Sequence, residues 1–323
     1  MKAIRIHEFG PTEQVLKYED VPTPEPGPNE VLIKIEAAAL NRADLGLRKG
    51  TYRVSPEELP IIPGREFAGT VAETGVTVKD FKVNERVVAY TGKGGYAEYA
   101  VATLSELRPV PNGLDLVSAA AIPTVFLTAW FGLLEDAKLK SGDWLLVQAG
   151  SSGVGVAAIQ IGKYLGSHVI TTTSGDEKCR RLRELGADVV IDYMKNDFAP
   201  EVKRSTADRG VDVVLEMLGG DVYKNSLEVL APSGRLVSIG GAFGPIPDRP
   251  PPLNEGRKAT RFSITNYLKA KPEDFVQLDT LLKLVKERRF QVVIDKTFPL
   301  AEARAAQRYL EGREHFGKVV LTM

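Results

Sequence analysis

The sequence predicts an α/β protein with a β-rich first part and a doubly wound parallel sheet in its second part. Three observations predict this class. The chain has 323 residues, about twice the length of a common domain, so two domains are expected. Short alternating apolar runs, separated by glycine and proline, fill residues 1–110. From about residue 119, short β-branched runs alternate with helix-like stretches, which is typical of βαβ units.

The β-rich part contains a series of strand-like segments. They cover residues 2–9, 31–40, 69–75, 85–90 and 96–102. Residues 21–30, "VPTPEPGPNE", predict a loop because proline has no N–H to donate to a sheet. This part is therefore expected to form an irregular, mostly antiparallel β domain.

The second part has the rhythm of strands that are buried on both faces. Its strand-like runs are residues 144–149, 168–173, 188–193, 212–217 and 234–240. The helix-like stretches between and after them lie near 154–165, 177–186, 196–205 and 221–231. The C-terminal region then predicts an amphipathic helix over 272–289, a strand over 292–300, a helix over 301–312 and a strand over 317–323.

Composition excludes several classes of protein. Lys plus Arg and Asp plus Glu are both 42, and no basic stripe is visible, so nucleic acid is not an expected partner. The single cysteine, Cys179, allows no intrachain disulfide and no multi-cysteine metal site, and we expect it to be a buried small hydrophobe. Residues 116–134 carry no charge, but Pro123 and Thr124 divide them, which favours two buried helices over a membrane span. With no signal peptide in "MKAIRIHEFG", we expect a cytoplasmic protein that does not bind membranes.

A glycine cluster follows the first strand-like run of the second part. In "WLLVQAGSSGVGVAA" (144–158), Gly153, Gly155 and Ala158 form the pattern G-x-G-x-x-A, with Gly150 just upstream. Between a strand and a helix, such a pattern predicts a turn that brings backbone N–H groups to a pyrophosphate at the helix N-terminus. The alternative is a helix-capping loop with incidental glycines.

The residue that follows the next strand indicates which dinucleotide is bound. NAD enzymes place Asp or Glu about 20 residues on from the glycines, where it accepts from the ribose 2′-hydroxyl. Here that position is Thr173, which does not repel a 2′-phosphate, and Ser174 and Lys178 follow it. Lys178 can supply a positive charge, and the alternative is a solvated helix residue. The sequence therefore predicts NADPH rather than NADH.

Segments along nearly the whole chain resemble the zinc-free quinone oxidoreductases, the zeta-crystallin group of the medium-chain dehydrogenase/reductase superfamily. They include "PGREFAGTV", "GGYAEYAV", "AAAIPTVFLTAW", "QAGSSGVG", "ELGADVVIDY", "GRLVSIGG" and "GKVVL". The resemblance implies a GroES-like substrate domain from residues 1–124 and 266–323. It also implies a Rossmann NADPH-binding domain from residues 125–265, and a homodimer.

The same resemblance raises the question of zinc, because the superfamily contains zinc alcohol dehydrogenases. Where those enzymes carry catalytic Cys, His and Cys ligands, this chain has Asn41, Arg65 and Thr124, none of which is a usual zinc ligand. The cysteine-rich lobe of their structural zinc is also missing. We therefore expect no metal and no zinc-dependent alcohol oxidation.

The resemblance also implies which residues form the site. Asn41 and Tyr52 are placed around the nicotinamide and the substrate, with Asn41 as a polar positioner and Tyr52 as a donor to the developing oxyanion or as a proton donor. The alternatives are an asparagine that satisfies a turn and a tyrosine packed on its own domain. The remaining expected cofactor residues are Thr128, Ser151, Ser152, Gly153, Val154, Gly155, Thr173, Ser174, Lys178, Tyr193, Gly240, Gly241, Ala242 and Phe243.

Three functions remain open from the sequence. The first is hydride transfer from NADPH to a quinone, an acceptor that is electron-poor without a metal. The second is reduction of an enone, an alkenal or an enoyl thioester, for which Arg42, Arg48, Lys49 and Arg53 would form a basic rim near Tyr52. The third is a non-catalytic NADPH-binding or structural protein.

Overall fold

The computed structural model describes residues 1–242, 244–247 and 250–323. The chain divides into two compact units. The first comprises Met1–Thr124 and Ala270–Met323, and the second comprises Val125–Lys269. The sequence places the same first boundary after residue 124, and it places the second after residue 265 rather than 269.

The second unit is built on a six-stranded parallel sheet. Its strand order is β10 (Val189–Asp192), β9 (His168–Thr173), β8 (Trp144–Val147), β11 (Val211–Glu216), β12 (Leu230–Ser238) and β13 (Lys258–Arg261). Every neighbouring pair is parallel. The order reverses at β8, which is the arrangement of a doubly wound Rossmann sheet. The predicted fold class is confirmed.

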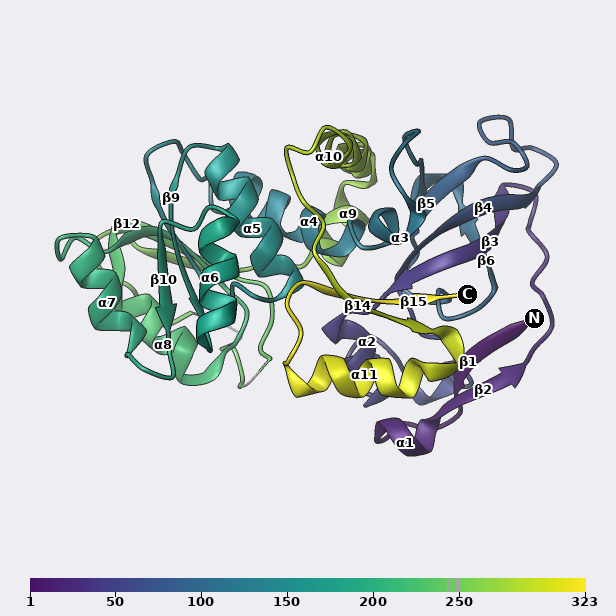
Figure 1. The fold of residues 1–323 in the computed structure, drawn as a ribbon, viewed down its shortest axis with the longest axis horizontal. Helices are drawn as coiled ribbons and strands as arrows, with labels where there is room; N and C mark the ends of the chain where they lie inside the picture. Colours follow the sequence, from purple (N-terminus) through teal and green to yellow (C-terminus); the bar gives the residue numbers. More distant parts are fainter. Residues whose placement is uncertain (243, 248–249) are drawn as a thin grey trace. The chain divides into compact units, whose positions relative to one another are not determined.

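Helices connect these strands and cover the sheet. They are α5 (Gly153–Tyr164), α6 (Asp176–Glu184), α7 (Phe198–Ser205) and α8 (Gly220–Glu228). The helices α7 and α8 lie side by side (Figure 1) and share a core with the strands through Phe198, Val202 and Leu227. The unit begins within α4 (Pro123–Phe131), continues through a π-helical turn (Gly132–Asp136), and closes with α9 (Ile264–Ala270). The edge strand β13 was not predicted, because its sequence "KATR" has no apolar run.

The first unit is a mostly antiparallel sheet drawn from two distant parts of the chain. Its order is β14 (Ile294–Pro299), β15 (Lys318–Thr322), β3 (Glu30–Ala39), β4 (Glu66–Thr74), β5 (Arg86–Tyr90) and β7 (Leu107–Pro109), and β6 (Tyr99–Thr103) pairs with β3. The pair β14–β15 is parallel, and the other pairs are antiparallel. The strands β15 and β3 are joined in register at Val320 and Ala39.

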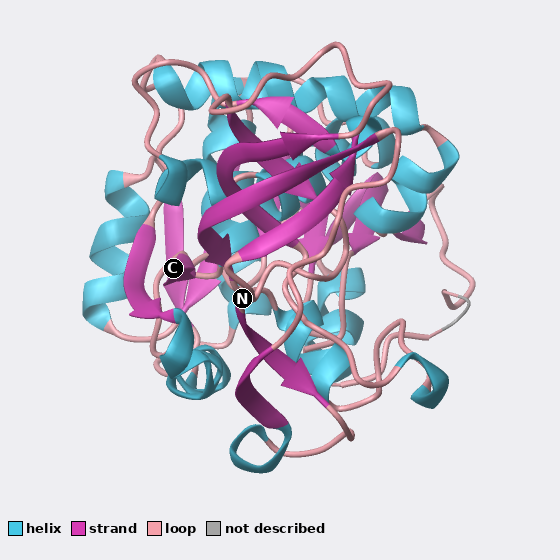
Figure 2. Cartoon of the chain, turned by 90° about the vertical axis from the view of Figure 1, so that its right-hand side faces the viewer, coloured by secondary structure: helices cyan, strands magenta, loops and turns pink. Residues whose placement is uncertain are grey.

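A two-stranded ribbon stands outside this larger sheet (Figure 2). It consists of β1 (Lys2–Ile6) and β2 (Leu16–Asp20), with α1 (Thr12–Val15) between them. Isolated bridges from Ala3 to Ala97 and from Ile6 to Ile61 attach β1 to the unit. The strand β2 was not predicted, since "LKYED" shows no regular alternation.

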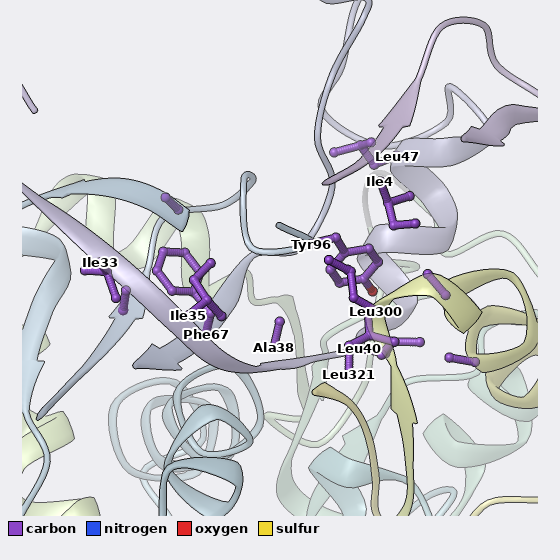
Figure 3. Close-up of a cluster of buried hydrophobic side chains, with 14 of the residues drawn as sticks. Ile4, Ile33, Ile35, Ala38, Leu40, Leu47, Phe67, Tyr96, Leu300 and Leu321 are labelled. Atoms are coloured by element: carbon purple, nitrogen blue, oxygen red, sulfur yellow. The ribbon is translucent and has the colours of Figure 1, made fainter. Parts of the chain in front are cut away.

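The helices of the first unit flank its sheet. They are α2 (Arg42–Arg48), α3 (Leu116–Ala120), α10 (Gln277–Lys286) and α11 (Ala303–Gly312), and α11 runs along β14 and β15 (Figure 1). The remaining turns are 3-10 helices at Pro56–Glu58, Leu104–Glu106, Pro272–Val276 and Leu300–Glu302. The helix predicted over 272–289 therefore begins as a 3-10 turn. Figure 3 shows part of the core, where Phe67 lies beside Ile35 of β3 and Tyr96 lies near Leu40 and Leu300.

The uncharged segment 116–134 forms two helices, α3 and α4, as predicted. Ala121 and Ile122 separate them and are fully buried. Among the helices of the described residues, none has the length and apolar character needed to cross a membrane.

Candidate functional site

The glycine cluster of the second unit is a tight strand–turn–helix connection. After β8, Ala149 adopts a left-handed backbone with φ of 53°, and α5 begins at Gly153. Ser152 caps the helix, because its Oγ accepts from the N–H of Gly155 at 3.0 Å. A Cβ on Gly155 would collide with the carbonyl of Ala149 and lie 2.7 Å from Cα of Gly150. Gly155 is thus required for the close packing of the turn on its helix.

The turn is held from the neighbouring strand and leaves backbone donors at its tip. Thr172 of β9 accepts from the N–H of Gly150 at 2.9 Å through its carbonyl, and from the N–H of Ala149 at 3.2 Å through its Oγ1. The first N–H groups of a helix have no partner within the helix, and those of Gly153 and Val154 belong to this class. Ser151 to Val154 are only half-buried. Half-buried amides at a helix N-terminus suit a pyrophosphate.

The structure brings Thr173, Ser174 and Tyr193 together at the carboxyl ends of β9 and β10. The N–H of Tyr193 donates to the carbonyl of Thr173 at 3.0 Å, and the side chain of Tyr193 is exposed. The side chain of Thr173 is buried, and its Oγ1 has no hydrogen-bond partner among the described residues. Ser174 and Lys178 are half-buried, with Lys178 in the first turn of α6. Because position 173 carries a threonine and not a carboxylate, nothing there repels a 2′-phosphate, and these groups fit NADPH.

The other expected cofactor residues lie in the segment after β12 and on α4. Gly240, Gly241 and Ala242 follow β12, and the N–H of Ala242 donates to the carbonyl of Met217 at 3.2 Å. Phe243, also expected at the cofactor, lies outside the described residues. Thr128 is a buried residue of α4.

Glu216, at the carboxyl end of β11, is a buried carboxylate that the sequence analysis missed. It accepts from the N–H groups of Leu218 at 2.5 Å and Gly219 at 2.8 Å, and from Oγ of Ser238 at 3.2 Å. Burial raises its pKa, although these hydrogen bonds oppose the shift. Glu216 therefore fixes the turn into α8. The sequence signal that could have identified Glu216 is its place at the end of a β-branched run, residues 211–216.

In the first unit, Asn41 is held by charged groups. It is buried at the N-terminus of α2, where its N–H donates to Oδ2 of Asp44 at 2.8 Å. Its Nδ2 donates to Oε1 of Glu66 at 2.8 Å and to the carbonyl of Ala39 at 3.3 Å. Its Oδ1 accepts from Nζ of Lys318 at 2.8 Å. The side chain of Asn41 therefore does more than satisfy the backbone of a turn.

Asp44 is fully buried behind Asn41. Burial raises its pKa to about 6, while Arg65 and the N–H of Asn41 act in the opposite direction. The hydroxyl of Tyr96 donates to its Oδ2 at 3.2 Å. Asp44 is thus a carboxyl group that titrates close to neutral pH.

Arg65 brings a positive charge against Tyr52. Its guanidinium carbon lies 5.4 Å from the ring centroid of Tyr52 and 5.8 Å from that of Tyr90, and Nη1 donates to the Tyr90 hydroxyl at 3.3 Å. Burial disfavours its charge, but Tyr90, Asp44 and Tyr52 outweigh that effect and raise its pKa. Arg53 lies 5.5 Å from the Tyr52 ring centroid as well. Tyr52 is thus half-buried between two cations.

Two members of the expected basic rim are already neutralised. Arg48 is only 1% exposed and binds Gln307 and Glu311, each at 2.9 Å. Nζ of Lys49 lies 2.7 Å from Oε1 of Glu311. The basic rim over Arg42, Arg48, Lys49 and Arg53 is therefore wrong in part, because Arg48 points into the core rather than toward a substrate. It pairs with α11, a contact that sequence spacing does not indicate.

The three positions that the resemblance aligns with zinc ligands are Asn41, Arg65 and Thr124, and these residue types are not usual zinc ligands. Beside Asn41 and Arg65, Thr124 donates its N–H to Oε2 of Glu66 at 2.6 Å. Within the described part of the chain, no three His, Cys, Asp or Glu side chains gather as a metal site. Cys179 is buried, and burial raises its pKa, which agrees with a small core residue.

Comparisons with known proteins agree along the whole chain. Residues 27–112 match the alcohol dehydrogenase GroES-like domain, and residues 185–321 match the zinc-binding dehydrogenase family. The quinone oxidoreductase of Sus scrofa is 34% identical over 100% of this chain and 98% of its own. The 2-haloacrylate reductase of Burkholderia sp is 33% identical over 98% of this chain and 97% of its own.

Solved structures of similar proteins cover the chain equally well. A mycobacterial protein complexed with NADPH is 36% identical with a TM-score of 0.92, and an NAD-dependent alcohol dehydrogenase is 33% identical with a TM-score of 0.91. Both alignments cover 100% of each chain. Full-length identity to several quinone oxidoreductases decides the group. The chain belongs to the quinone oxidoreductases of the medium-chain dehydrogenase/reductase superfamily.

Proposed function

We propose that this protein reduces a quinone with NADPH and without a metal. The observation that carries the proposal is the contact of Tyr52 with Arg65, which replaces a zinc ligand by a buried cation beside a phenol. Amide, guanidinium and threonine groups do not form a Lewis-acid site. The acceptor must therefore already be electron-poor, as a quinone is.

The second unit supplies the residues that hold the cofactor, and NADPH supplies a hydride. The amides of Gly153 and Val154 would bind the pyrophosphate at the start of α5. Ser174, Lys178 and Tyr193 would hold the 2′-phosphate, next to Thr173. Gly240, Gly241 and Ala242 would line the cofactor, with Ser151, Ser152 and Gly155 in the turn and Thr128 at the nicotinamide half.

The first unit supplies the groups that meet the developing charge. When a quinone gains a hydride, negative charge collects on its oxygen, and one proton completes the hydroquinone. The hydroxyl of Tyr52 donates its proton to that oxygen, and the positive charge of Arg65 stabilises the phenolate that is left. Asn41 positions the nicotinamide end.

A second candidate is reduction of an activated alkene by the same hydride. The likeness to a 2-haloacrylate reductase, 33% identical, supports it. The burial of Arg48 and the pairing of Lys49 with Glu311 speak against a polyanionic thioester, since fewer cations face outward. A non-catalytic NADPH-binding protein would bind the cofactor and turn over neither class of acceptor.

The test is oxidation of NADPH, in parallel with NADH, in the presence of an ortho-quinone, a para-quinone, a 2-alkenal, an α,β-unsaturated ketone and crotonyl-CoA. We expect turnover of quinones with NADPH preferred. A Tyr52→Phe variant should lose about 100-fold or more in kcat, the usual range for a positioned proton donor. Tyr18→Phe, an exposed tyrosine of β2, is the matched control and should behave as the wild type.

The outcomes separate the candidates. Faster turnover of an alkene than of any quinone would move the protein to the alkene reductases. NADPH binding without consumption of any acceptor would support the binding protein. For the assembly we propose a homodimer, and light scattering after size-exclusion chromatography would contradict it by giving the mass of one chain.

A further inference from the structure

The first unit contains an ion pair that is almost completely removed from water. Nζ of Lys318 lies 2.8 Å from Oε1 of Glu66, and the two side chains are 5% and 0% exposed. Lys318 also donates to the carbonyl of Leu40 and to Oδ1 of Asn41, each at 2.8 Å. An ammonium has three N–H groups, so these three acceptors use all of them.

The carboxylate is satisfied in the same way. Oε1 of Glu66 accepts from Lys318 and from Nδ2 of Asn41, and Oε2 accepts from the N–H of Thr124 at 2.6 Å. Burying such a pair costs several kcal/mol per ion, so its attraction roughly offsets its desolvation. Stability alone therefore gives no reason for the pair, whereas a geometric role does.

The geometry that the pair imposes is the orientation of one amide. A flipped Asn41 would turn its NH2 group toward the ammonium of Lys318 and its oxygen toward the carboxylate of Glu66. Both contacts would be repulsive, and each opposing charge is buried. The two hydrogens of Nδ2 are taken by Glu66 and by the carbonyl of Ala39. What remains is a lone pair on Oδ1.

We propose that Lys318 is a positioning residue that, with Glu66, fixes Asn41 so that it can only accept a hydrogen bond. This rests on the proposed role of Asn41 at the nicotinamide end of NADPH. The matching donor there is the N–H of the nicotinamide carboxamide. Asn41 consequently selects the cofactor through that N–H and does not donate to the substrate oxygen, a task left to Tyr52.

The test measures binding of the reduced cofactor by its fluorescence, with no acceptor present. NADPH is compared with its reduced 3-acetylpyridine analogue, in which a methyl group replaces the carboxamide nitrogen. The wild type should prefer NADPH by about fivefold to tenfold, the range of one hydrogen bond. Lys318→Met and Asn41→Ala should each reduce this preference to within about twofold. The double variant should lose no more than either single one, because both remove the same interaction.

Controls separate positioning from general destabilisation. Arg48→Met removes another buried cation, from the helix that Asn41 begins, without touching the amide of Asn41. It should lower stability in urea yet keep the preference for NADPH. Lys318→Arg should restore part of the preference. If Lys318→Met does not fold, the pair Glu66→Gln with Lys318→Met removes both charges together and provides the same measurement.

An unchanged preference in a folded Lys318 variant, or an equal loss in Arg48→Met, would overturn the proposal. Absence of any preference in the wild type would overturn it too. Since no acceptor is used, a failure to reduce quinones leaves this result intact, and the two proposals fail separately.

Discussion

The two units of this protein each bury a glutamate at a strand end, and they satisfy it in opposite ways. Glu216 in the second unit accepts from backbone N–H groups two and three residues away. Glu66 in the first unit is satisfied by Asn41, Thr124 and Lys318, which are 25, 58 and 252 residues away. The second unit therefore shapes its site by local backbone turns, and the first does so by groups from distant segments, including the charged side chain of Lys318.

The difference has an energetic consequence. A carboxylate held by backbone amides can be replaced at the cost of a few hydrogen bonds, about 1–3 kcal/mol when donors are left unsatisfied. A carboxylate that neutralises a buried ammonium leaves that charge uncompensated when it is removed. We therefore expect the first unit to tolerate change at its glutamate much less than the second.

The largest effect should come from Glu66→Ala. It leaves the ammonium of Lys318 buried and unpaired, so the free energy of unfolding should fall by about 3–5 kcal/mol. Glu216→Ala should cost about 1–3 kcal/mol. Urea unfolding at neutral pH measures both, and equal losses would break the comparison.

The next effect concerns the backbone turn. Gly155→Ala places a methyl group 2.7 Å from Cα of Gly150, so we expect a loss of about 2–3 kcal/mol in stability and weaker NADPH binding. Gly132→Ala is the control in the same unit, because its new methyl group would lie 3.6 Å from Leu215, an ordinary contact. It should be neutral within about 0.5 kcal/mol. If Gly155→Ala keeps the stability and the NADPH binding of the wild type, the turn can shift to make room for the methyl group, and the prediction is wrong.

A change of charge at the end of β9 should alter the choice of cofactor. Thr173→Asp introduces the carboxylate that NAD enzymes carry there, which repels a 2′-phosphate and accepts from a 2′-hydroxyl. We expect the ratio of kcat/KM for NADPH over NADH to fall by about tenfold or more, which is about 1.4 kcal/mol. Thr173→Val, which removes only an unpaired hydroxyl, should leave that ratio unchanged. A ratio that resists the aspartate would place the 2′-phosphate elsewhere.

The last expected effect is on the pH dependence of stability. The pKa of Asp44 is raised from 3.8 to about 6, so the folded protein holds this proton more tightly than the unfolded chain. Its contribution is therefore lost as pH rises from about 4 to about 6. Asp44→Asn should flatten that fall by about 2–3 kcal/mol. Urea titrations at pH 4 and pH 7 give the slope, and a steeper fall in the variant would contradict the sign.

More of the site could be predicted from the sequence in the second unit than in the first, and the reason is physical. Gly155, Ser152 and Thr173 lie in segments whose residue types alone indicate a strand, a turn and a helix. The contact of Lys318 with Glu66 depends on the pairing of β15 with β3, which no local pattern encodes. In the sequence Lys318 precedes an apolar run and Glu66 follows Arg65, and neither position indicates the other. The edge strand β13 escaped because it has no apolar run.

The discontinuous first unit also bears on how the protein is made. During synthesis the second unit emerges as one uninterrupted stretch and can fold at once, as contiguous domains do. The sheet of the first unit has to wait, because 277 residues separate Asn41 from Lys318. Before β15 is synthesised, the carboxylate of Glu66 lacks the ammonium of Lys318 that pairs with it in the folded unit. That carboxylate therefore has to stay hydrated in the nascent chain. Closure of the first unit on its last strand is then the step that completes the surroundings of Asn41 in a newly made chain.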